Sequence, residues 1–120
     1  MTRAQFERLV REALGNIPDE IKARLENVDV VVEGWATPDQ LAGAGIDEDH
    51  YLMGLYEGIP LPDRYNYDLV LPDKITLFQD AIEELCSTEE EIIEEVRMTV
   101  VHEVAHHFGI DDDRLHEIGV

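Results

Sequence analysis

The strongest constraint on the fold is a long amphipathic helix near the carboxyl end of the chain. Ser87 and Thr88 can cap its start, and Glu91, three residues after Thr88, would complete a capping box. With a step of about 100° per residue, apolar side chains share one side of this helix: Ile93, Val96, Val100, Val104 and Phe108. Gly109 can adopt a positive φ and end the helix. Because one face is apolar, the rest of the chain must supply a core that covers it.

The first third of the sequence predicts two helices and a strand. A helix is expected from Thr2 to Gly15-Asn16, because apolar side chains recur there at helical spacing: Phe6, Leu9, Val10, Ala13 and Leu14. Pro18 can open a second short helix that reaches Leu25. Residues 28–33 (VDVVVE) are short and β-branched, which predicts a strand. Residues 37–49 contain turn and cap residues with little periodicity, so we expect a loop.

The middle of the chain predicts two more strands around a long connection. Residues 52–57 (LMGLYE) are expected to form a strand, and residues 58–73 hold three of the five prolines, as a surface connection would. Residues 73–78 (DKITLF) alternate Ile75 and Leu77 with other side chains, which predicts a half-exposed edge strand. Short helices are expected at 81–86 and 113–118. The order of helices, strands and helices predicts an α+β fold, and 120 residues fit one domain spanning 1–120.

The charge of the chain restricts its partners. It has 28 acidic and 9 basic residues, a formal net charge of −19. Such a surface repels polyanions, which argues against nucleic acid and anionic membranes and favours metal ions or cationic peptides. The alternative is a solvated acidic surface without a specific partner. No signal peptide and no run of ~20 apolar residues is visible, and the single cysteine, Cys86, is expected in the core, so we expect a cytoplasmic protein.

The segment HEVAHHFGIDD carries the chemistry. His102 and His106 lie four residues apart and project from the same side of a helix, opposite the apolar face. Two such imidazoles can bind one zinc ion, and a catalytic zinc site has three protein ligands and a water molecule. Glu103 is displaced by about 100° from His102, so its carboxylate can reach the water as a general base. The pattern therefore predicts a zinc site.

The residues after the helix offer a third ligand. In the pattern H-E-x-x-H-x-x-G-x-x-H, Gly109 marks the sharp turn and the last position falls on Asp112, whose oxygen is a suitable zinc ligand. Nearby alternatives are Asp111, Asp113, His116 and Glu117. His107 points partly towards the apolar face of the helix, which favours a buried, hydrogen-bonded histidine or a residue that supports the metal ligands without binding the metal. His50 lies in an acidic segment and is expected to be exposed.

The stretches HEVAHHFGIDDDRLHEIG, LPDKITLF and LMGLYEG resemble a family of minimal bacterial zincin-like metallopeptidases, from about Val28 onward. The resemblance implies a small mixed sheet beside the active-site helix, zinc on His102, His106 and Asp112, and Glu103 as the catalytic base. The larger metzincin clan shares the geometry of this motif but has a downstream Met-turn. This chain lacks one, since only eight residues follow Asp112 and none is methionine.

The sequence therefore favours a zinc-dependent peptidase that acts on peptides or proteins, with the strand at residues 74–78 available to pair with the substrate backbone. Candidate groups for stabilising the oxyanion are Tyr65, Tyr67, Arg114 and His116. The main alternative is a metal-binding module without activity, since few residues remain for a substrate cleft. A metal-dependent ribonuclease is a third hypothesis, which the net charge of −19 and Glu103 oppose. The physiological substrate and the oligomeric state stay open.

Overall fold

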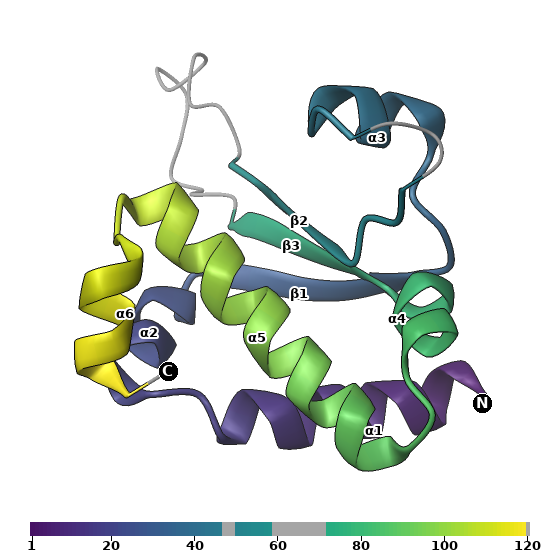
Figure 1. The fold of residues 1–120 in the computed structure, drawn as a ribbon, viewed down its shortest axis with the longest axis horizontal. Coiled ribbons are helices and arrows are strands. Elements are labelled where there is room, and N and C mark those ends of the chain that lie inside the picture. The colour runs from purple at the N-terminus through teal and green to yellow at the C-terminus, as the bar shows by residue number, and fades with distance from the viewer. Residues whose placement is uncertain (47–49, 59–71, 120) are drawn as a thin grey trace.

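A three-stranded mixed sheet lies at the centre of the fold, as Figure 1 shows for this computed structural model, which describes residues 1–46, 50–58 and 72–119. The strand order is β1-β3-β2. Strand β1 (Val28–Glu33) pairs in parallel with β3 (Asp73–Phe78), and β2 (Gly54–Glu57) pairs with β3 in antiparallel fashion. The mixed sheet and the surrounding helices confirm the expected α+β class.

The prediction of an edge strand at residues 73–78 is wrong, because β3 is the central strand of the sheet. Four consecutive side chains of β3 are buried, namely Ile75, Thr76, Leu77 and Phe78. The alternation in the sequence suggested one solvated face. Threonine and phenylalanine fit a covered face as well as an open one, so the pattern could not distinguish the two cases.

Helices surround the sheet and account for most of the remaining described residues. They are α1 (Arg3–Gly15), α2 (Asp19–Lys22), the 3-10 turn η1 (Ala23–Leu25), α3 (Pro38–Gly43), α4 (Gln79–Leu85), α5 (Glu89–Phe108) and α6 (Asp112–Ile118). The prediction of a loop over 37–49 is wrong in its first half. Thr37 and Gln40 form a capping box that starts α3, and Pro38 occupies the first helical turn, where it favours helix.

Helix α5 crosses the sheet diagonally, with α1 below it in the view of Figure 1. Its buried side chains are Ile92, Val96, Val100, Val101, Val104 and Ala105. They join Ile75 and Leu77 of β3 in one core with Phe6 and Leu9 of α1. The core face is therefore displaced from the expected one by part of a turn, since Phe108 is 40% exposed. Thr88 caps the helix by accepting from the N–H of Glu91, as expected.

Two details at the ends of α5 qualify the capping prediction. The carboxylate of Glu91 accepts from the N–H of Ser87 and not from that of Thr88, so the expected reciprocal box is only half formed. At the other end Gly109 has φ 71° and its N–H turns back to the carbonyl groups of the last helical turn, as predicted. Cys86, between α4 and α5, is only partly buried and packs against the core.

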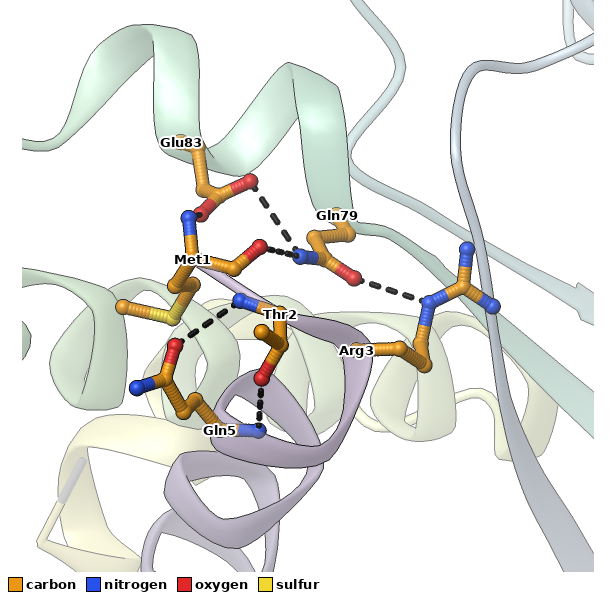
Figure 2. A network of polar contacts seen from close by, with 6 residues as sticks. All are labelled: Met1, Thr2, Arg3, Gln5, Gln79 and Glu83. Carbon is orange, nitrogen blue, oxygen red and sulfur yellow. Dashed lines mark hydrogen bonds and ion pairs between the residues drawn. The ribbon is translucent and has the colours of Figure 1, made fainter.

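A polar network ties the start of α1 to α4, as Figure 2 shows. The side chain of Gln79 is only 4% exposed. Its amide oxygen accepts from Nε of Arg3 at 2.8 Å, and its Nε2 donates to the carbonyl oxygen of Met1 at 3.1 Å. Arg3 also donates to the carbonyl oxygen of Val32 on β1 at 2.6 Å. A buried amide with these partners fixes how α1 and α4 meet at the end of the sheet.

Within the described ranges, no helix is both long and apolar enough to cross a membrane.

Candidate functional site

A glycine allows α5 to approach β2 closely. A Cβ atom on Gly54 would lie 2.5 Å from Cγ2 of Thr99 and 3.3 Å from the carbonyl oxygen of Thr76. Any larger side chain at this position would therefore push α5 away from the sheet. Glu103 follows Thr99 by four residues, so it lies one turn further along the same side of α5. The contact at Gly54 thus controls how near Glu103 comes to β2.

Glu103 lies against the outer edge of β2, where its Oε1 accepts a 2.9 Å hydrogen bond from the backbone N–H of Tyr56. The N–H of Phe78 donates to the carbonyl oxygen of Met53. In an antiparallel ladder such bonded pairs alternate with pairs whose backbone groups point away from the partner strand. Tyr56 lies three residues after Met53 and opposite Ile75, so it belongs to the outward-pointing set. The carboxylate is therefore held at an outer edge of the sheet.

The two histidines of the motif lie one turn apart, with ring centres 6.5 Å from each other. Nδ1 of His102 is 2.8 Å from the carbonyl oxygen of Met98, which can only accept, so Nδ1 is the donor and Nε2 is the ring nitrogen that can bind a metal ion. His106 is exposed, so packing does not fix its ring. Two imidazoles on one tetrahedral zinc ion have ring centres roughly 5 Å apart. Side-chain rotations that bring the rings closer by about 1.5 Å would therefore fit zinc.

The third ligand is not assembled in the same way. Within 1–46, 50–58 and 72–119, no three His, Cys, Asp or Glu side chains are grouped so that they could hold one metal ion. Asp112 is exposed at the first position of α6. Its neighbour Asp111 caps α6 by accepting from the N–H of Arg114, which occupies one of its carboxylate oxygens. Asp112 therefore stays a prediction as the third ligand, and the histidine pair is the part of the site that fits zinc.

The sequence pattern of the zincin-like metallopeptidase family matches residues 25–120, which run from η1 through β1 to the end of the chain. The chain belongs to this family. A solved structure, a conserved hypothetical protein from Thermus thermophilus, is similar to it, with 24% identity and a TM-score of 0.62 over 90% of this chain and 94% of that one. At this identity the likeness shows the fold alone. No curated protein matches the chain.

In this zincin-like protein, the side chain of Tyr56 joins a cluster beside the motif. Its hydroxyl donates to Oδ2 of Asp73 at 2.6 Å, and its ring stacks on that of His107 with centres 3.9 Å apart. Burial, together with the hydrogen bond and the negative charge of Asp73, raises the pKa of Tyr56 well above its ordinary value. Nε2 of His107 lies 3.7 Å from the same carboxylate oxygen. The cluster fixes the last turn of α5 against β2 and the start of β3.

The structure bears on several predictions about individual residues. His107 is not buried, since 38% of its side chain is exposed. Arg114 was a candidate for stabilising an oxyanion, but its guanidinium binds Glu20 at 2.7 Å and Glu117 at 3.0 Å, which fastens α6 to α2. His116 is exposed on α6, and His50 is exposed as expected. Tyr65 and Tyr67, the other candidates, lie outside the described residues.

The prediction that residues 74–78 are available to pair with the substrate is also wrong. Strand β3 has β1 on one side and β2 on the other, so its backbone groups have no free edge for a peptide. The outer strand next to the motif is β2, through Tyr56. One clue to this is present in the sequence: a glycine inside a strand pattern, Gly54, marks the close approach of another element. Nothing in the sequence pointed to Tyr56, because only the strand register shows where its N–H is directed.

Proposed function

We propose that this zincin-like protein is a zinc-dependent peptidase in which His102 and His106 hold the metal ion with Asp112, and Glu103 is the general base. The observation that carries the proposal is the hydrogen bond between Glu103 and the N–H of Tyr56. It holds a carboxylate from the motif beside the outer edge of β2. An extended peptide can add to such an edge through backbone hydrogen bonds. A purely structural metal site has no use for a base in that position.

Each residue of the motif would have a separate role in the proposed reaction. His102 presents Nε2, because Met98 holds Nδ1, and His106 adds a second imidazole from the next turn. When bound, zinc polarises the scissile carbonyl group and makes its water molecule more acidic. Glu103 takes a proton at its carboxylate and passes it to the leaving amine. The N–H of Tyr56 binds Oε1, and no described residue donates to Oε2, which we therefore assign as the oxygen that takes that proton.

The net charge of −19 favours cationic peptides as substrates and disfavours nucleic acids. The charge acts mainly on the rate of encounter and on the choice among peptides, and it weakens as salt is added. Substrate selection should therefore be measured at low and at physiological ionic strength.

The metal site is tested by zinc content. Protein purified without chelator or affinity metal should contain about one zinc ion per chain, and His106→Ala should lose it. His50→Ala is the matched control, because His50 is exposed and outside the motif. Asp112→Asn compared with Asp113→Asn tests the third ligand in the same assay. If the wild-type protein still contained no zinc after incubation with zinc at neutral pH, this result would overturn the metal site and the peptidase with it.

Activity is tested separately from metal binding. A library of cationic peptides should be cleaved by the wild-type protein and left intact by Glu103→Gln at unchanged zinc content. The alternative function is a metal-binding module without activity. One observation favours it: within the described part of the chain, no third ligand is grouped with the two histidines. Full zinc content together with no cleavage of any peptide would support that alternative.

A further inference from the structure

An exposed aromatic pair lies at one end of the sheet. Trp35 is 50% exposed and Tyr51 is 43% exposed, although both are large and apolar. Their ring centres are 5.3 Å apart and the planes are tilted by 58°. We call Trp35 and Tyr51 the aromatic pair. Two adjacent exposed rings on a strongly acidic surface present a patch that can take up an apolar side chain.

Strand register places the aromatic pair at the end of β2 away from Glu103. Glu33, the last residue of β1, pairs with Phe78, and the N–H of Phe78 donates to the carbonyl oxygen of Met53. The end of β1 and the approach to β2 therefore meet at the same end of β3. Trp35 follows Glu33 by two residues, and Tyr51 precedes Met53 by two.

The same strand connects the pair to the proposed base. Tyr56, which binds Glu103, lies five residues after Tyr51. At ~3.3 Å per residue the separation along an extended chain is roughly 16 Å. A peptide that adds to the outer edge of β2 before Tyr56, whose N–H is already bound to Glu103, would reach the aromatic pair about four to five residues from the bond at Glu103.

The direction of the peptide follows from the direction of β2. The strand runs from the aromatic pair towards Glu103, since Gly54 precedes Tyr56. Antiparallel pairing is somewhat more stable per residue than parallel pairing. A peptide bound in this way runs from Glu103 towards the pair, so the residues beyond the scissile bond on its carboxyl side meet Trp35 and Tyr51. A second copy of the chain is a poor occupant, because each copy carries a charge of −19.

We propose that Trp35 and Tyr51 form a substrate subsite that binds an apolar side chain about four to five residues on the carboxyl side of the cleaved bond, in an extended cationic peptide. The proposal rests on the proposed peptidase function and specifies its substrate. It makes the aromatic pair a specificity-determining contact outside the metal site. The subsite explains why two rings from separate segments remain exposed together at the end of the edge strand.

Binding is tested with protein that cannot cleave. Trp35 is the single tryptophan of the sequence, so its fluorescence reports directly on the patch. Glu103→Gln protein is titrated with a ten-residue peptide of lysine, threonine and alanine that contains one leucine, and with the same peptide carrying alanine instead. We expect the leucine peptide to change the Trp35 emission and to bind about fivefold more tightly.

A variant and a control distinguish binding at this subsite from nonspecific binding to exposed apolar side chains. Adding Tyr51→Ala should reduce the advantage of leucine to less than twofold. Leu85→Ala, which removes another exposed apolar side chain (54% exposed, on α4), should leave the advantage intact. Equal affinity for the two peptides, an unchanged Trp35 emission, or a leucine advantage that survives Tyr51→Ala would overturn the proposal.

The register is tested with wild-type protein and mass spectrometry. The leucine peptide should be cut about four to five residues before the leucine, and moving the leucine by two positions should move the cut by two. A cut that stays in place would overturn the proposed subsite while leaving the peptidase intact. Absence of any cut, with leucine-dependent binding to the Glu103→Gln protein, would count against the peptidase and support the subsite.

Discussion

Gly54→Ala tests whether the close contact between β2 and α5 holds Glu103 at the edge of the sheet. The added methyl group would lie 2.5 Å from Cγ2 of Thr99, whereas carbon atoms pack at about 3.5–4.0 Å. The overlap of about 1 Å cannot be relieved by a simple rotation, because a β-branched side chain in a helix has few χ1 choices. Helix α5 must therefore move away from β2.

The expected cost is about 1–3 kcal/mol of unfolding free energy, the usual range for an extra methyl group in a packed interior. Thr99→Ser removes the obstructing Cγ2 and by itself should cost about 0.8 kcal/mol for the lost methyl burial. In the double variant the new and the missing methyl groups compensate. We expect a favourable coupling of at least about 1 kcal/mol between the two sites. Relief is incomplete, because the carbonyl oxygen of Thr76 still lies 3.3 Å from the new atom.

The assay is urea unfolding of the wild type, the two single variants and the double variant, analysed as a double-mutant cycle. Gly43→Ala is the matched control. Gly43 is the last residue of α3, and a Cβ there meets no atom within 4 Å, so this change should be neutral or slightly stabilising. If Gly54→Ala behaved like Gly43→Ala, or if the cycle gave no coupling, α5 would not be held by this contact.

Three further predictions concern single side chains. Within the described residues, Oγ1 of the fully buried Thr76 has no hydrogen-bond partner, so Thr76→Val should raise the unfolding free energy by about 1 kcal/mol in urea unfolding; a loss of stability would contradict this. Burial, followed by the charges of Glu95 and Glu91, raises the pKa of the Cys86 thiol. At pH 8, iodoacetamide should therefore react more slowly with Cys86 than with the thiol of free glutathione; an equal rate would refute the shift. The pKa of Tyr56 is raised above the ordinary value of about 10, so its contribution to stability is complete below that pH and is lost as the pH rises towards the folded pKa. Above pH 10 the thermal midpoint of the wild type should therefore fall more steeply than that of Tyr56→Phe, and parallel curves would contradict the assignment.

Local sequence signals identified most of the elements. Val28–Glu33 forms a strand as expected, because β-branched residues suit a pleated, partly covered surface. Helix α5 begins after Thr88 and ends at Gly109, since a capping hydroxyl and a left-handed glycine act within a few residues of themselves. Helix α3 was missed, because its six residues have too few turns for an apolar period to stand out.

The candidate site, too, could be predicted from the sequence only in part. The spacing of His102, Glu103 and His106 places two imidazoles on one helix face, whatever the rest of the fold does. The third ligand could not be decided by spacing, because Asp112 follows a turn and its position depends on how α6 packs. That packing is set by Arg114, which contacts Glu20 from a segment 94 residues away.

What the sequence by itself determined about this protein is the helix, its two histidines one turn apart and the adjacent carboxylate, since these depend on helical geometry alone. Only the tertiary structure decided that β3 is central, that β2 is the outer strand beside the motif, and that the N–H of Tyr56 meets Glu103. The physical reason is that strand order and register arise from contacts between segments far apart in the chain. Short-range patterns of polarity do not record those contacts.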